Sequence, residues 1–116
     1  MKKCFLFLMC VWQISFAARI VEARWDGQTQ SVVVDMAYRG GCLDHEFRVQ
    51  WIGCVVDAEG TGVVSRLGNI LDTGWQDACE DDLAQTITFV EPHDSCRADV
   101  IVLKSTSSKV PHVIVK

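Results

Sequence analysis

The chain has 116 residues, 11 basic and 15 acidic side chains, and a formal net charge of −4. This length suits one small domain. The acidic balance disfavours nucleic acids and anionic membrane surfaces as partners, because both select basic faces.

The first 17 residues have the features of a secretory signal peptide. Met1–Lys3 is a short basic start, Cys4–Phe16 is largely apolar, and Ser15-Phe16-Ala17 offers small residues for cleavage after Ala17. The apolar run is shorter than the roughly 20 residues of a membrane-spanning helix, which disfavours an anchor. We predict a signal peptide over residues 1–17 and a single β-rich exported domain over residues 18–116. The exported domain would have a net charge of about −6, since Lys2 and Lys3 leave with the leader, and would not insert stably into a membrane.

The exported part begins with a predicted hairpin. Ile20–Trp25 mixes apolar and polar residues and ends at Asp26-Gly27, which is a turn signal. Ser31–Ala37 follows, and its consecutive valines favour a buried strand because β-branched side chains suit a pleated surface. The polar residues between these two segments predict that they pair as a hairpin.

The next segment contains a double glycine and the clearest strand. Arg39-Gly40-Gly41 interrupts the strand pattern, since glycine permits positive φ angles or a close approach of the backbone. Cys42–Asp44 then predicts a loop or a bulge. In Glu46–Trp51 apolar and polar residues alternate, which indicates one buried and one solvated face and places Trp51 in the core. Cys54–Val56 either extends this strand or begins the next.

Further strands are predicted in the second half. Val63–Leu71 fits both a helix and a strand, and its glycine and β-branched residues favour the strand. Gln85–Val90 alternates and ends before Pro92, because proline cannot continue a hydrogen-bond ladder. Val100–Lys104 and Val110–Val115 are the last two predicted strands, joined by a serine-rich hairpin loop.

These segments together predict an all-β protein. Roughly six to eight short strands separated by turn signals are typical of a small antiparallel β-sandwich or barrel. The tryptophans of the exported part are candidate core anchors, but tryptophan is also enriched at interfaces. Trp75, in a predicted loop beside Gly74, could serve either role.

Four cysteines remain after removal of the leader: Cys42, Cys54, Cys79 and Cys96. In a small exported domain such a set most often forms two disulfides, for which three connectivities exist. A bridge over the long span from Cys42 to Cys79 would stabilise the fold by about 4 kcal/mol on the chain-entropy model. We therefore expect a disulfide-stabilised domain.

Two alternatives give these cysteines a chemical role. Cys42-x-x-His45 and His93-x-x-Cys96 have a spacing suited to a four-ligand zinc site, but an oxidising compartment removes the thiolates. Cys42 beside His45 could be a catalytic nucleophile, but an even number of cysteines favours pairing. We expect no catalytic residue, no metal and no cofactor, and we assign His45 a packing or hydrogen-bonding role.

Carboxylates cluster at Asp77, Glu80, Asp81 and Asp82. Oxygen ligands of this kind suit calcium, but their spacing does not match the helix–loop–helix calcium loop. A solvated acidic loop is the favoured interpretation. The sequence also contains no serine-nucleophile, zinc-protease or phosphate-loop motif.

One segment resembles a known set of proteins. Gly40-Gly41-Cys42-Leu43-Asp44-His45-Glu46-Phe47 is similar to a Gly-Gly-Cys-x-x-His-x-Phe segment of small, uncharacterised exported bacterial domains, many of them lipoproteins. A second, weaker similarity covers Asp77–Glu80 and the strand that follows it. The resemblance implies a Cys42–Cys79 bridge, which leaves Cys54 with Cys96, and a β-rich exported fold without an established activity. This chain lacks the lipoprotein cysteine, and the family pattern does not itself supply the second bridge.

The resulting functional expectation is a non-catalytic, secreted or periplasmic domain with a binding or structural role and an unidentified protein partner. One alternative is a periplasmic inhibitor or immunity-type protein that blocks a hydrolase with a rigid loop, since a pre-organised loop loses little entropy on binding. Gly40–His45 and Asp72–Asp82 are the candidate loops, with His45 and Trp75 as candidate binding-loop residues. A second alternative is a zinc-binding or thiol-redox protein that uses Cys42, His45, His93 and Cys96.

Overall fold

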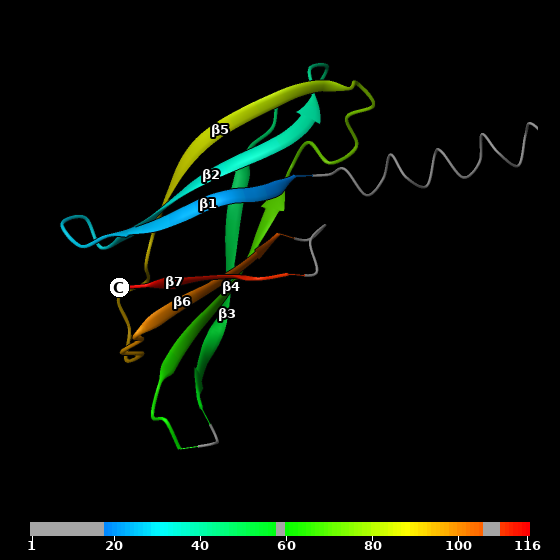
Figure 1. The fold of residues 1–116 in the computed structure, drawn as a ribbon. Helices are drawn as coiled ribbons and strands as arrows, with labels where there is room; N and C mark the ends of the chain where they lie inside the picture. The colour runs from blue at the N-terminus through cyan, green and yellow to red at the C-terminus, as the bar shows by residue number, and fades with distance from the viewer. Residues whose placement is uncertain (1–17, 58–59, 106–109) are drawn as a thin grey trace, which may run out of the picture.

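The structure is a computed structural model that describes residues 18–57, 60–105 and 110–116. These residues form seven strands and no helix, which confirms the predicted all-β class (Figure 1). In chain order the strands are β1 (Arg19–Asp26), β2 (Ser31–Gly40), β3 (Phe47–Val56), β4 (Val64–Asp72), β5 (Asp81–Val90), β6 (Val100–Ser105) and β7 (His112–Val115). The expected signal peptide, residues 1–17, lies outside the described residues.

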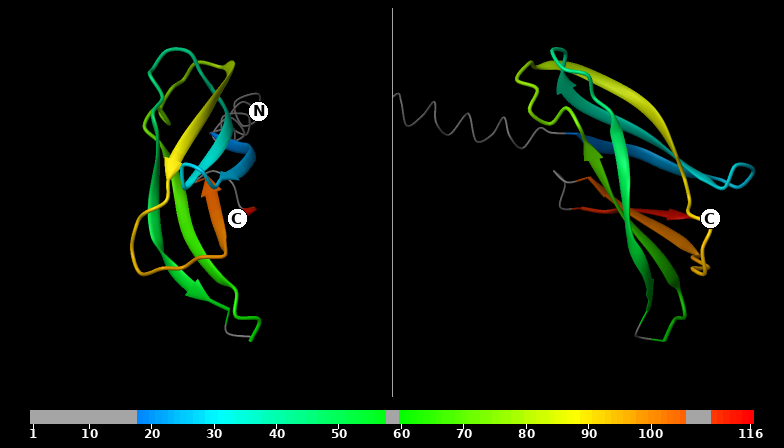
Figure 2. Two further views of the ribbon diagram at one scale, coloured as in Figure 1. Left: turned by 90° about the vertical axis from the view of Figure 1, so that its left-hand side faces the viewer. Right: turned by 180° about the vertical axis from the view of Figure 1, so that it is seen from behind.

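The strands are divided between two sheets. One has the order β1-β2-β5 and is antiparallel throughout, and the other has the order β3-β4-β6-β7. The two sheets lie against each other, so the chain forms the sandwich rather than the barrel (Figure 2). Strands β4 and β6 pair in parallel, which departs from the expected antiparallel arrangement. The chain passes from β4 through β5 in the other sheet before it returns as β6, so β4 and β6 run in the same direction.

The strand boundaries largely follow the predicted segments. β1 and β2 form the expected hairpin, with Trp25 opposite Val32 and the turn closed by a hydrogen bond from the Gln28 N–H to Asp26 Oδ1 (3.0 Å). The ambiguous segment 63–71 is a strand, β4. β3 continues past Gly53 as one strand with a register shift. β7 begins only at His112, two residues later than predicted, because the preceding residue is a proline without an N–H.

The core lies between the two sheets and follows the period-two pattern of the strands. β2 contributes alternate buried side chains from Val32 to Tyr38, and the opposite sheet contributes the members Phe47, Ile70, Ile101, Leu103 and Ile114. Each such side chain, fully buried, stabilises the fold by about 1.5–3 kcal/mol. Trp51 packs against this core as predicted, and Trp25 does the same.

The chain crosses between the sheets three times. Residues 41–46 join β2 to β3 and residues 73–80 join β4 to β5, and these two crossings lie at the same end of the sandwich. The third crossing, residues 91–99, joins β5 to β6 at the other end (Figure 1). The Cys42–Cys79 disulfide ties the first two crossings together, and Cys54–Cys96 ties β3 to the third. The structure therefore contains both predicted disulfides, with the pairing that the resemblance implied.

Candidate functional site

The two crossings at one end are joined by a disulfide and by several side-chain hydrogen bonds. We call residues 41–46 and 73–80 the crossover tip. Its loops are joined by the Cys42–Cys79 disulfide, with a Cα–Cα distance of 5.7 Å. At the base of the loops, the Glu46 N–H donates to Thr73 Oγ1 and the Thr73 N–H donates to the Glu46 carbonyl, both at 3.0 Å. The second loop is shorter than the predicted loop Asp72–Asp82, because β4 extends to Asp72 and β5 begins at Asp81.

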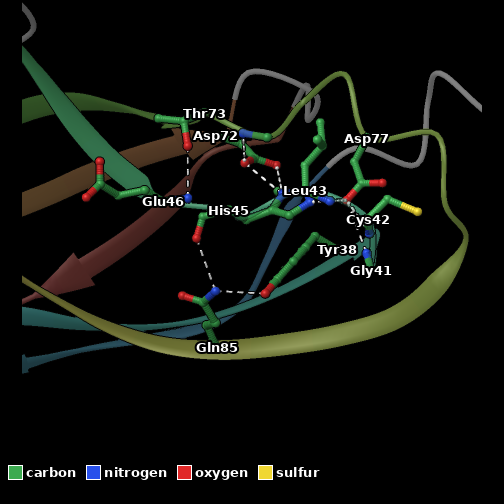
Figure 3. Close-up of polar contacts among 12 residues, drawn as sticks. Tyr38, Gly41, Cys42, Leu43, His45, Glu46, Asp72, Thr73, Asp77 and Gln85 are labelled. Atoms are coloured by element: carbon green, nitrogen blue, oxygen red, sulfur yellow. Dashed lines mark hydrogen bonds and ion pairs between the residues drawn. The ribbon is translucent and has the colours of Figure 1, made fainter.

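Asp77 organises both loops of the tip. Its Oδ2 accepts backbone hydrogen bonds from Gly41 (3.1 Å), Cys42 (3.2 Å) and Leu43 (2.9 Å), and its Oδ1 accepts one from Cys79 (3.0 Å) (Figure 3). The side chain is only 1% exposed. Burial by itself raises the pKa of this carboxyl, but the backbone donors and His45 outweigh it and lower the pKa. The predicted solvated acidic loop is therefore wrong for Asp77, which lies inside the loop pair and holds it together.

His45 lies between two carboxylates. Its Nδ1 is 2.9 Å from both oxygens of Asp72, and its Nε2 is 2.9 Å from Asp77 Oδ2 (Figure 3). Both ring nitrogens face acceptors, so both donate and the ring is an imidazolium. Burial opposes this charge, but the hydrogen bonds to Asp77 and Asp72 outweigh it and raise the pKa of His45. The ring of Tyr38 packs against it, with the ring centroids 4.6 Å apart.

Gly40, the last residue of β2, lies against the side chains of His45 and Asp77. A Cβ atom at Gly40 would lie 2.5 Å from His45 Nε2 and 2.7 Å from Asp77 Oδ2. A side chain would therefore displace the ion pair itself. The double glycine that interrupts the strand pattern in the sequence thus marks the place where the backbone comes close to a buried charge network.

This geometry limits what the predicted chemical groups can do. Cys42 and Cys96 are in two different disulfides, so neither sulfur is a thiolate for zinc or for nucleophilic attack. The side chain of His45 is 2% exposed and has no unoccupied ring nitrogen. Within the described residues, the ligand atoms of Cys42, Asp77 and Cys79 lie within 4.8 Å of one another. Two of these are the bridged sulfurs, and the third belongs to the carboxylate that accepts the backbone N–H groups.

The tip also presents exposed apolar side chains. Trp75 is 69% exposed and follows Gly74 in the turn that covers His45. Leu43, on the other loop, is 51% exposed although its N–H is bound to Asp77. Of the two roles that the sequence left open for Trp75, the structure therefore places it on the surface rather than in the core.

A second buried charge cluster holds the opposite end, and the sequence analysis missed it. Arg66 on β4 donates from Nε to Glu91 Oε2 (2.8 Å) and from its two terminal nitrogens to Asp94 (2.7 and 3.1 Å). Lys116 donates to the other Glu91 oxygen at 2.6 Å. The side chain of Arg66 is only 3% exposed. The alternation along the strand was an available signal. Arg66 lies two residues before Gly68 and four before Ile70, so its side chain points to the same, buried face of β4.

A hollow of about 310 Å³ lies beside this cluster. It is lined by Gln30, Glu91, Pro92, His93, Asp94, Cys96, Arg97, Ala98, Asp99 and Lys116. The hydrogen bonds from Arg66 and from the Cys96 N–H lower the pKa of Asp94 to about 2. The negative charges of Glu91 and Asp94 are thus already paired with cations of the protein, Arg66 and Lys116. His93, which the alternative zinc hypothesis used as a ligand, lies on the exposed rim of this hollow and not at the crossover tip.

The fold and the tip define a small all-β domain with two disulfides. A scan against protein-family models gave no match, and searches of curated proteins and of solved structures gave no significant match. The resemblance through residues 40–47 therefore stays a prediction. In the described part of the chain, no helix has the length and apolar character needed to cross a membrane.

Proposed function

We propose that this protein is a non-catalytic exported domain, secreted or periplasmic, that binds a protein partner through the crossover tip. The observation that carries the proposal is the 69% exposure of Trp75 on a loop held by a disulfide and by buried ion pairs. Tryptophan is enriched among the residues that dominate binding energy. A loop that is already fixed loses little conformational entropy when it binds.

The buried network supports a binding role rather than a catalytic one. A general base needs an accessible atom within hydrogen-bond reach of its substrate. His45 donates both ring N–H groups to carboxylates and is enclosed by the tip. Its charge therefore serves to hold the two loops in one conformation. The same arrangement leaves Trp75 and Leu43 as the side chains that a partner would meet first.

Export is supported by the disulfides and by the sequence of the leader. Structural disulfides persist in oxidising compartments, and two of them tie together the crossings of this small sandwich. The apolar segment 4–16 followed by small residues has the features of a signal peptide, which would direct the chain to such a compartment.

A narrower form of the proposal is an inhibitor or immunity-type protein that inserts the tip into the cleft of a hydrolase. The observation that favours it is the convergence of two rigid loops, each with an exposed apolar side chain, at one end of the sandwich. Loss of a hydrolase activity on addition of the domain, and its retention with Trp75→Ala, would support this form.

Site-specific photocrosslinking tests the general proposal. A photoreactive phenylalanine analogue replaces Gln76, which is exposed beside Trp75, in the full chain expressed in its native compartment. We expect a discrete crosslinked partner that Trp75→Ala removes and that Val113→Ala keeps, since Val113 is also exposed (62%) but lies on β7. A partner that crosslinks equally in the Trp75→Ala background, or no partner at Gln76, would refute the tip as the binding surface.

A further inference from the structure

We infer that the crossover tip fits a partner whose surface is cationic around an apolar pocket, that is, a basic protein. This inference rests on the proposed function and adds the chemical class of the partner. It depends on the coincidence of an exposed tryptophan and an excess of exposed carboxylates over cations at the same end of the molecule.

Exposed carboxylates surround the loops of the tip. They come from both loops and from the adjoining start of β5, and they are Asp44, Glu46, Glu80, Asp81 and Asp82. The register of the β2–β5 pair places Asp81 opposite Gly40 and Asp82 opposite Arg39, so the acidic start of β5 lies beside the first loop. The carboxylate of Asp81 lies next to Gly41, because a Cβ there would be 2.7 Å from Asp81 Oδ2.

The neighbouring cations do not balance these carboxylates. Arg39 lies 3.6 Å from Glu80 and 3.5 Å from Asp82, while Arg48 pairs with Glu46 at 2.7 Å. Such exposed pairs contribute little to stability. The carboxylates of Asp44 and Asp81 form no hydrogen bond or ion pair with any described residue. At the end of the molecule that carries Trp75, the five exposed carboxylates therefore outnumber the two guanidinium groups that pair with them.

The acidic groups of the tip thus divide into two kinds. Asp72 and Asp77 are buried (7% and 1% exposed) and hold His45 and the loop backbones. Within the part of the chain that the structure describes, the outer carboxylates accept no backbone hydrogen bond at the tip. In a chain that is already acidic, their mutual repulsion is unfavourable. Charges arranged around an apolar anchor are typical of interfaces in which complementary potentials speed association and exclude wrong partners.

Selection from a phage-displayed library of random dodecapeptides tests this inference, with the full oxidised exported domain as the bait. We expect enrichment of peptides that combine lysine or arginine with aromatic or large aliphatic residues. Their affinity should fall about tenfold or more with Trp75→Ala, as for an anchor residue. It should fall severalfold with Asp44→Lys and on raising the salt concentration, as for a charged rim.

The matched control is Glu22→Lys, which makes the same charge change at an exposed position on β1 opposite Asp35. It should leave peptide affinity unchanged. Enriched peptides that need Trp75 but are neutral or acidic, or that ignore Asp44→Lys, would overturn the charge inference and leave the proposed function intact. Absence of any peptide whose binding needs Trp75 would overturn both.

Discussion

Gly74 lies directly over the imidazole ring of His45, since a Cβ atom at Gly74 would come within 2.7 Å of the ring atoms Cγ and Nδ1. The Gly74 N–H also donates to Asp72 Oδ1 (2.8 Å), and the same oxygen accepts a hydrogen bond from Nδ1 of the His45 ring. Backbone, ring and carboxylate therefore form one unit, and Trp75 is the next residue along the chain. The position of the exposed tryptophan is set by a contact that only glycine permits.

Gly74→Ala is expected to destabilise the protein by about 1–3 kcal/mol, because overpacking a filled site forces the ring or the turn to move. Gly53→Ala is the matched control, since a Cβ at Gly53 meets no atom within 4 Å. It should be neutral or slightly stabilising. Thermal unfolding followed by circular dichroism would compare the two, and equal melting temperatures would contradict the close contact at Gly74.

His45→Leu is expected to cost about 3–5 kcal/mol, because it removes the cation and leaves the carboxylates of Asp72 and Asp77 buried without their partner. Guanidinium unfolding of the oxidised protein measures this loss. His93→Gln serves as the control, because His93 is exposed, and it should change stability by less than about 0.5 kcal/mol. Similar losses for the two variants would show that the Asp72–His45–Asp77 network does not stabilise the fold.

The stability of the protein is expected to fall on both sides of an intermediate pH. His45 has a raised pKa in the folded protein, so its contribution is complete below its ordinary value of 6.5 and is lost as the pH rises through the raised pKa. Asp94 contributes above its ordinary pKa of 3.8, and this contribution is lost as the pH falls toward about 2. Unfolding free energies measured across the pH range test this, with His45→Gln as the comparison. An alkaline loss of the same size in His45→Gln would exclude His45 as its source.

Removal of the two disulfides is expected to have different local effects. Each double variant, Cys42→Ser/Cys79→Ser or Cys54→Ser/Cys96→Ser, should lose about 2–5 kcal/mol of stability. Only the first should speed amide hydrogen exchange at positions 43 and 79, whose N–H groups bind Asp77 in the intact tip. Hydrogen exchange with mass spectrometry distinguishes the two. Faster exchange at the tip after removal of Cys54–Cys96 would show that the tip is not an independent unit.

The sequence by itself determined most of the strands and predicted the two disulfides. Period-two alternation in residues such as Phe47, Val49 and Trp51 specifies which face of a strand is buried, because successive side chains point to opposite sides. Glycine and proline positions then mark the turns between strands. The four cysteines of residues 18–116 predicted two disulfides, because an even set in a small exported domain usually pairs.

Only the tertiary structure decided which polar groups are enclosed and what they hold. His45 lies more than 25 residues from Asp72 and Asp77 in the sequence, so no local pattern distinguishes Asp77 inside the tip from Asp82 in solvent. The parallel pairing of β4 with β6 likewise follows from the path of the chain through the other sheet. Trp75 has the same loop context in either role, and its exposure depends on the close packing of Gly74 over the ring of His45. Periodicity records the local environment of a strand, whereas buried charge pairs are fixed by long-range contacts that form only when both sheets are in place.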